Sequence, residues 1–303
     1  MCGICGIWNY RTGEPVDRDL LRAMTESIAH RGPDDDGLYF DDAAGIGLGF
    51  RRLSIIDLSP AGHQPMSNED GSVWTVFNGE IYNFLELRPA LEARGHVFRS
   101  RTDTEVILHH YEERGAEAFA DLWGMFGLAI WDARERRLTL ARDRVGKKPL
   151  YIYDDGERIL FASELKAILR DRSVPREVDS SALAEYLALG YVGSPRTILR
   201  GVTKLEPGHT LVHDGRRAVR RRYWDWLPAF EADERVSEDE WCDRLRHTLR
   251  EAVRARMISD VPLGAFLSGG VDSSAVVAMM AELSDRPVKT FSETVSSAKS
   301  CGS

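Results

Sequence analysis

The sequence lacks several features that define whole classes of protein. It has no run of about 18 apolar residues, which a membrane-spanning helix requires. Its N-terminus does not show the basic segment followed by an apolar segment that marks a secretory signal peptide. It has only 4 cysteines in 303 residues, which are too scattered for a disulfide framework. We therefore expect reduced thiols and a cytoplasmic location, with no membrane partner.

An excess of positive charge is also missing. The formal net charge is −8, which argues against a nucleic-acid-binding surface because such surfaces are strongly basic. Hydrophobic residues make up 43% of the chain and charged residues 29%, as in an ordinary globular protein that buries a core. The length favours two domains.

The second residue is a cysteine, and its position gives it distinct chemistry. If Met1 is removed, Cys2 becomes the N-terminus and carries both a thiol and an α-amine with a pKa of about 8. Such an amine can serve as the base that activates the nucleophile. Cys2 and Cys5 also have the C-x-x-C spacing of redox pairs and zinc half-sites, although no second pair follows. We expect Cys5 to be buried in an apolar strand over residues 3–8.

Three further segments carry polar residues suited to binding a small polar substrate. Arg52 precedes an apolar run and is either a surface arginine or a guanidinium that binds a carboxylate. Asn78 and Gly79 read as a turn, at which a side-chain amide and a backbone N–H can form an oxyanion hole. Asp103 lies in a capping box over residues 102–105, and it serves either the helix dipole or a substrate ammonium.

A glycine-rich segment near residue 270 has the pattern of an anion site. A buried strand is expected over residues 261–267, and a helix begins after residue 274. Free N–H groups and the helix dipole at such a junction favour phosphate, and Asp272 could hold a magnesium ion. The G-x-x-x-x-G-K loop is absent, and an ordinary strand–helix turn is the alternative. The candidate ATP-binding residues are Leu267, Ser268, Gly269, Gly270, Asp272, Ser273 and Ser274.

Periodicity and turn residues predict the remaining elements. Helices are expected over residues 17–29 and 164–169, and a long core-facing helix should start at a capping box over residues 237–240. The charge-rich segment 141–151 is either a solvated hairpin end or a buried ionic set that braces a site. Strands are expected over residues 37–40, 45–56, 72–77, 125–131, 137–140, 150–153 and 159–162.

Seven segments in order carry a resemblance to a known family. MCGICGI, HRGPD, RLSIID, NGEIYN and TDTEV resemble the class II glutamine amidotransferase domain. With ARDRVGKKPLY and SGGVDSS added, residues 2 to about 292 resemble the glutamine-hydrolysing asparagine synthetases. Several motifs in the same order are more specific than any one of them.

The resemblance implies a fold and a division into domains. Residues 2–170 would form an α+β sandwich of the N-terminal nucleophile type, with α/β/β/α layers. Residues 171–236 would connect it to an incomplete α/β domain of the PP-loop, Rossmann-like type over residues 237–292. The polar tail 293–303 departs from the family pattern, and we expect it to be disordered.

The resemblance also implies roles for the candidate residues. Cys2 would attack the side-chain amide of glutamine, its own α-amine would relay protons, and this step needs no cofactor. Asn78 and the Gly79 N–H would hold the oxyanion, and Arg52 would bind the α-carboxylate. Asp103 and Glu80 would bind the α-ammonium, and the backbone at Leu53 and Ile55 would line the pocket.

In the second domain, the resemblance implies ATP and Mg²⁺ as cofactors and aspartate as the acceptor. Ammonia would reach it through an internal tunnel, and a homodimer is an expected assembly. The departure after Ser292 suggests a frameshift or an incomplete gene record. We therefore expect glutaminase chemistry without asparagine synthesis from this chain alone. Two alternatives are an amidotransferase for a different carboxylate acceptor and a non-catalytic module that binds partner subunits.

Overall fold

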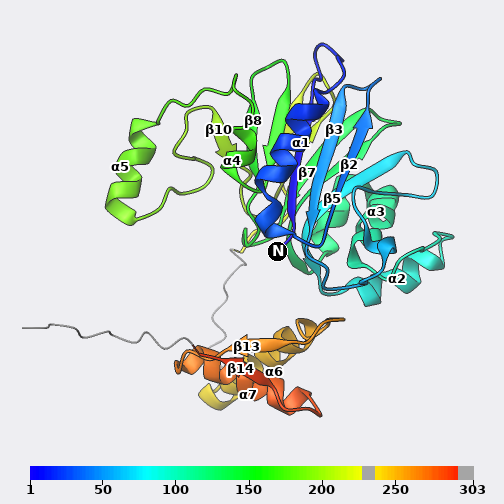
Figure 1. Ribbon diagram of the computed structural model, residues 1–303. Coiled ribbons are helices and arrows are strands. Elements are labelled where there is room, and N and C mark those ends of the chain that lie inside the picture. The colour runs from blue at the N-terminus through cyan, green and yellow to red at the C-terminus, as the bar shows by residue number, and fades with distance from the viewer. Residues whose placement is uncertain (227–235, 293–303) are drawn as a thin grey trace, which may run out of the picture. The chain divides into compact units, whose positions relative to one another are not determined.

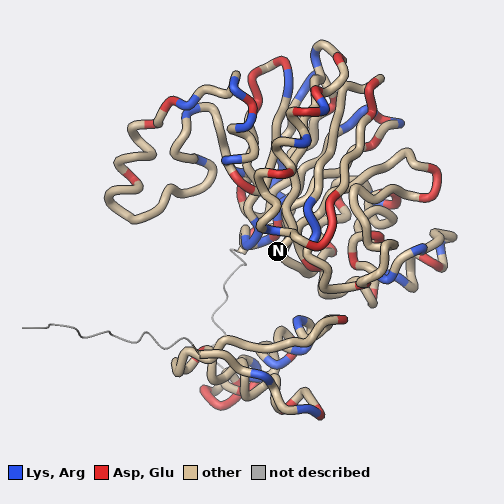
Figure 2. Tube along the Cα trace, viewed as in Figure 1, with Lys and Arg blue, Asp and Glu red and all other residues tan. Residues whose placement is uncertain are grey.

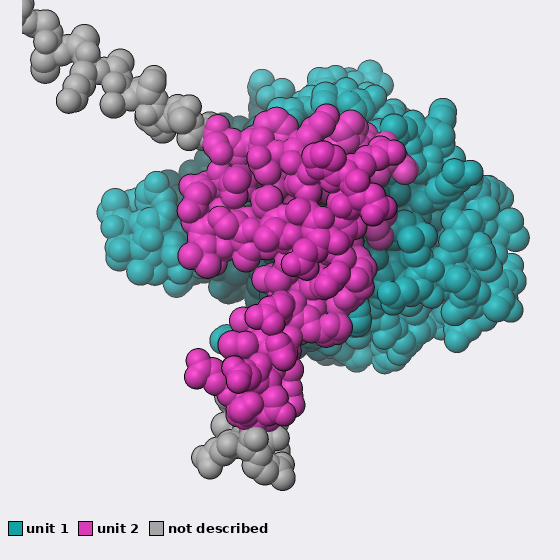
Figure 3. Space-filling view, turned by 90° about the horizontal axis from the view of Figure 1, so that it is seen from below, with its two compact units in different colours: residues 1–228 teal, residues 229–303 magenta. Residues whose placement is uncertain are grey.

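The computed structural model describes residues 1–226 and 236–292. The chain divides into two compact units, Met1–Pro228 and Ala229–Ser303, which Figure 3 shows in different colours. The tail 293–303, expected to be disordered, lies outside the described residues. Acidic and basic residues are interspersed along the described parts of both units (Figure 2).

The first unit contains two six-stranded sheets (Figure 1). One has the order β10-β8-β9-β1-β3-β2, and all its neighbouring strands are antiparallel. The strand over residues 3–8 is confirmed as β1, which lies between β9 and β3. The bounds are β1 Gly3–Trp8, β2 Asp35–Asp41, β3 Ile46–Arg52, β8 Tyr151–Asp154, β9 Ile159–Ala162 and β10 Val202–Lys204.

The other sheet has the order β12-β11-β7-β6-β5-β4 and is also antiparallel. Its long central pair, β5 and β6, provides one wall of the cavity described below. The bounds are β4 Met66–Ser67, β5 Val73–Ile81, β6 Gly124–Asp132, β7 Arg137–Arg142, β11 His209–His213 and β12 Ala218–Arg222.

The two sheets face each other across one apolar core. Ile4 and Phe50 of the first sheet share a buried cluster with Val76 and Trp131 of the second. On the outer face of the first sheet, Cys5 packs in a second cluster that includes side chains of α1 (Arg18–Ser27). The predicted helix/sheet/sheet/helix sandwich is confirmed, with α3 (Asp103–Arg114) next to the second sheet (Figure 1). The remaining helices of this unit are α2 (Phe84–Glu92), α4 (Leu165–Ile168) and α5 (Ser180–Leu189).

The segment 171–236, expected to connect two domains, contributes to both sheets. β10 pairs with β8 at the edge of the first sheet, and β11 pairs with β7 in the second. These strands complete the sandwich because each covers a strand edge whose N–H and C=O groups would otherwise lack partners. The first compact unit therefore extends to Pro228.

Two local predictions were wrong. Asn78 and Gly79 do not form a turn, because β5 continues through them and pairs with Gly127 and Phe126 of β6. Residues 102–105 do not form a capping box, although α3 begins at Asp103 as expected. Glu105 instead accepts hydrogen bonds from the backbone N–H groups of residues 99 and 100, at 2.7 Å each.

The charge-rich segment 141–151 contains a buried polar network, which was one of its two predicted forms. Arg142 donates to the carbonyl oxygens of residues 146, 148 and 205. Asp143 is fully buried and accepts N–H groups from Phe126, Val145, Lys147 and Lys148 at 2.9–3.2 Å. These bonds hold in place the segment that positions Lys148 at the cavity.

The second unit contains α6 (Glu238–Ala255), β13 (Gly264–Phe266), α7 (Val271–Leu283) and β14 (Lys289–Phe291). The capping box at Ser237 is confirmed. The core-facing prediction for α6 was wrong in its first half, because Trp241 and Leu245 are exposed. The strand before the glycine-rich loop was expected to be buried, yet Phe266 is 83% exposed. Of the described helices, none is both long and apolar enough to cross a membrane.

The Asp143 network provides a stability test. Asp143→Ala would leave four buried N–H groups without their acceptor, so the free energy of unfolding should fall by at least about 3 kcal/mol. Chemical denaturation measures this change. The control is Asp214→Ala, which removes an exposed carboxylate that accepts two turn N–H groups. Equal effects of the two substitutions would contradict the bracing role of Asp143.

Candidate active site

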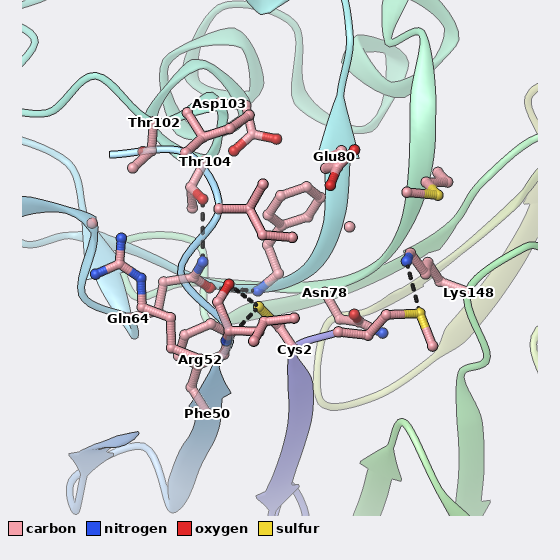
Figure 4. Close-up of a pocket in the computed structure, with 18 residues that line it drawn as sticks. Cys2, Phe50, Arg52, Gln64, Asn78, Glu80, Thr102, Asp103, Thr104 and Lys148 are labelled. Atoms are coloured by element: carbon pink, nitrogen blue, oxygen red, sulfur yellow. Dashed lines mark hydrogen bonds between the residues drawn. The ribbon is translucent and has the colours of Figure 1, made fainter. Parts of the chain in front are cut away.

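A cavity of about 240 Å³ lies where the start of β1 meets β5 and the N-terminus of α3 (Figure 4). The predicted site residues that line it come from four sequence segments, each of which was singled out for its polar chemistry. The eight predicted site residues of the first unit that line this cavity are Cys2, Arg52, Leu53, Ile55, Asn78, Gly79, Glu80 and Asp103.

Cys2 is held at the cavity through its backbone and its sulfur. Its carbonyl oxygen accepts the Arg31 Nε–H at 2.8 Å, and Arg31 pairs with Glu164 at 3.0 Å. Its Sγ accepts the Leu53 N–H at 3.4 Å. Burial raises the pKa of the Cys2 thiol, and the Leu53 N–H partly opposes that rise. The thiol therefore needs a nearby base before it can attack a substrate.

Met1 also lines the cavity. Its sulfur lies 3.1 Å from Nζ of Lys148 (Figure 4). Burial lowers the pKa of the Met1 amino group and of the Lys148 ammonium. Removal of Met1 would free the α-amine of Cys2, so that one residue would carry both the amine and the thiol.

Asn78 presents an unpartnered amide to this cavity. The residue is fully buried, and neither its Oδ1 nor its Nδ2 has a hydrogen-bond partner. A buried polar group without a partner costs about 1–3 kcal/mol. A ligand oxygen that accepts the Nδ2–H would remove part of that cost, which makes Asn78 a preformed donor.

The strand geometry directs the Gly79 N–H to the edge of β5 that faces Gln64 and Asp103. Phe77 N–H donates to Oε1 of Gln64 at 2.7 Å, and Ile81 N–H donates to Oδ2 of Asp103 at 2.8 Å. Alternate residues of a strand point their N–H groups to the same edge, so the Gly79 N–H between them faces this edge as well. A side chain at position 79 would clash with the Met125 carbonyl oxygen.

Arg52 is buried, which rules out the surface-arginine alternative. Its Nη1 donates to the Ser59 carbonyl oxygen at 3.0 Å, and its Nη2 donates to the Asp57 carbonyl oxygen. A guanidinium has five N–H donors, so these two bonds orient the group and leave other donors for a ligand. Gly62 lies so close to Nη2 that a side chain there would clash.

Asp103 is deeply buried, and the pKa of its carboxyl group is strongly shifted. Burial raises the pKa of its carboxyl group to about 7, and the negative charge of Glu80 adds to the rise. The Ile81 N–H opposes the shift. A substrate ammonium beside Asp103 would favour the ionised carboxylate and offset the cost of burying it.

Gln64 and Lys148 also line the cavity, and neither was predicted as a site residue. Gln64 donates through Nε2 to Thr104 Oγ1 at 3.1 Å, and its Oε1 accepts the Phe77 N–H. Lys148 reaches the cavity from the charge-rich segment 141–151. The charges of that segment could have indicated Lys148 from the sequence, whereas Gln64 lies in a stretch of sequence without a recognisable pattern.

The glycine-rich loop of the second unit lies between β13 and α7. Gly269 has a φ of 82°, which favours glycine. Gly270 is the N-cap of the 13-residue α7, and no side chain caps that end. Ser268 Oγ and Ser273 Oγ lie 3.0 Å apart. Free N–H groups and hydroxyls at a helix N-terminus suit a phosphate group.

Comparisons with known proteins agree with this architecture. Residues 1–224 match the family described as "Glutamine amidotransferase domain", and residues 244–300 match "Asparagine synthase". In solved structures, the chain resembles glutamine phosphoribosylpyrophosphate amidotransferase from Bacillus subtilis. That likeness has a TM-score of 0.53 at 19% identity and covers 95% of this chain and 65% of the other.

Two facing antiparallel sheets between helices, with a cysteine directly before a central strand, define the N-terminal nucleophile fold class. Within that class, the chain belongs to the glutamine amidotransferase domain family.

Curated relatives extend over both units. Asparagine synthetase [glutamine-hydrolyzing] 1 of Bacillus subtilis is 40% identical over 96% of this chain and 45% of its own length. The putative asparagine synthetase [glutamine-hydrolyzing] 2 of Methanocaldococcus jannaschii is 38% identical over 96% of this chain and 59% of its own. The chain thus spans about half the length of these relatives.

The shifted pKa of Asp103 predicts a change in stability with pH. The carboxyl is protonated in the folded chain up to a pKa of about 7, whereas the unfolded acid loses its proton near 3.8. Between these values the folded state binds more protons, so this group lowers the free energy of unfolding as pH rises. Asp103→Asn keeps an acceptor for the Ile81 N–H and should remove this dependence of the free energy of unfolding on pH.

Denaturation of both chains at pH 4.5 and pH 8 measures the effect. The difference in stability between Asp103→Asn and the parent chain should favour the variant more strongly at pH 8. A difference that does not vary with pH would contradict the raised pKa.

Proposed function

We propose that this chain hydrolyses the side-chain amide of glutamine at Cys2 and supplies the ammonia to an asparagine synthetase reaction. The observation that carries the proposal is the convergence, on one cavity, of a nucleophile, two oxyanion donors, a guanidinium and a carboxyl group. The last two groups, Arg52 and Asp103, match the α-carboxylate and α-ammonium of an amino acid.

Removal of Met1 begins the proposed mechanism, because it gives Cys2 a free α-amine. That amine takes the thiol proton, and Sγ attacks the amide carbon of glutamine. The carbonyl oxygen becomes an oxyanion that accepts hydrogen bonds from Asn78 Nδ2 and the Gly79 N–H. The amine then passes its proton to the leaving nitrogen, ammonia departs, and a thioester remains on Cys2. Water hydrolyses the thioester and releases glutamate.

The recognition of glutamine divides between the two ends of its amino-acid group. The Arg52 guanidinium, oriented by the two loop carbonyl oxygens, binds the α-carboxylate. Asp103 binds the α-ammonium, and Glu80 lies on the same cavity wall. The backbone at Leu53 and Ile55 forms the wall beside the Cys2 sulfur.

The second unit supports a proposal for the acceptor reaction. Leu267, Ser268, Gly269, Gly270, Ser273 and Ser274 would hold the pyrophosphate of ATP, with Asp272 placed for Mg²⁺. ATP would supply the activation of an aspartate carboxylate. The uncapped N-terminus of α7 supports this assignment, as do the names of the curated relatives.

Glutamate release from glutamine tests the nucleophile. Cys2→Ala removes the thiol that lines the cavity and would form the thioester, so release should fall to the uncatalysed background. Cys242→Ala is the matched control, because it removes an exposed cysteine of the second unit, and it should keep the parent rate. Release from Cys2→Ala at the parent rate would contradict the proposal.

A further inference from the structure

A second polar cluster lies in the first unit and includes none of the residues that line the cavity. It brings together Glu69, which follows β4, His96, which follows α2, and His109 and Glu112 on α3. One potential ligand atom from each residue lies within 4.8 Å of all the others. Three segments distant in sequence therefore meet at one point.

Four distances in the cluster are close to those of a tetrahedral metal site. Nδ1 of His96 lies 3.8 Å from Glu69 Oε1 and 3.7 Å from Glu112 Oε2. Nδ1 of His109 lies 3.7 Å from the other Glu69 oxygen, Oε2, and 3.1 Å from Glu112 Oε2. Zinc bonds of about 2.0–2.2 Å give tetrahedral ligand-to-ligand distances of about 3.4 Å.

Hydrogen bonding within the cluster explains only part of this arrangement, namely the pair formed by His109 and Glu112. Three of those four distances exceed the range of a hydrogen bond. The rings of His96 and His109 lie 4.6 Å apart between centroids, so two protonated rings would repel each other. Two neutral rings and two carboxylates around a divalent ion would have no net charge, which suits a largely buried site.

The groups behind the four ligands also suit a metal. Nε2 of His96 lies 3.0 Å from Glu113 Oε1. Metal-bound histidines commonly donate their other N–H to a carboxylate in this way. Nε2 of His109 lies 3.9 Å from Glu105 Oε1, which is beyond hydrogen-bond range. The side chain of His109 is only 1% exposed, and its Nε2 has no hydrogen-bond partner.

We propose that Glu69, His96, His109 and Glu112 bind one divalent transition-metal ion of the Zn²⁺ type. Imidazole and carboxylate ligands suit such an ion. The ion would join the segment after β4, the segment after α2, and α3. Because Asp103 is the first residue of α3, the ion would also stabilise the helix that carries a cavity residue.

Metal titration of the full chain tests the proposal. After chelator treatment and desalting, Zn²⁺ binding is measured by calorimetry, and Co²⁺ binding is measured by its visible absorption, which is intense for tetrahedral sites. We expect one ion per chain, a higher Tm with Zn²⁺, and no comparable effect of Mg²⁺. Cys2→Ala should retain the site, which separates it from binding by the cavity thiol.

Two variants and a control locate the ion. His96→Gln and Glu69→Gln change partly exposed ligands, so these chains should fold but bind Zn²⁺ at least tenfold more weakly. His63→Gln changes an exposed histidine that pairs with Asp35, and it should bind as the parent does. Absence of stoichiometric binding to the parent chain would overturn the proposal, as would undiminished binding in both ligand variants.

Discussion

The position of β1 between β9 and β3 is the constraint on which the candidate site depends. Antiparallel pairing on both sides, with Gly3 opposite Arg51 and Cys5 opposite Ala162, fixes the strand in register. Cys2 therefore emerges at one defined point, where the Arg31 Nε–H holds its carbonyl oxygen. A nucleophile next to the chain end is otherwise prone to fraying. Burial of the strand on both faces supplies the rigidity that catalysis requires.

The cavity is assembled at a cost in stability. Asn78 has a buried amide without partners, and burial raises the pKa values of the Asp103 carboxyl and the Cys2 thiol. In the folded chain without a ligand, each of these polar groups lacks hydrogen bonds or solvation that it would have in water, and this loss lowers the free energy of unfolding. Glutamine would supply an oxyanion for Asn78 and an ammonium for Asp103. Binding and catalysis would thus relieve costs that folding imposes.

The sequence predicted much of the sandwich, because alternation and periodicity report which face of an element is buried. It also identified eight of the residues that line the cavity, through local chemistry and a family resemblance. It failed where long-range pairing overrides a local preference, as at Asn78 and Gly79, where β6 extends the strand. It also missed the cluster of Glu69, His96, His109 and Glu112, because only the folded chain brings those segments together.

The most direct measurement uses an electrophilic glutamine analogue with two forms of the chain, one beginning at Cys2 and one retaining Met1. The account predicts one covalent adduct per chain in the first form, located by peptide mass spectrometry on Cys2 and not on buried Cys5. The form with Met1 should react far more slowly, because it lacks the α-amine on Cys2. Equal rates of labelling, or an adduct on another residue, would contradict the account.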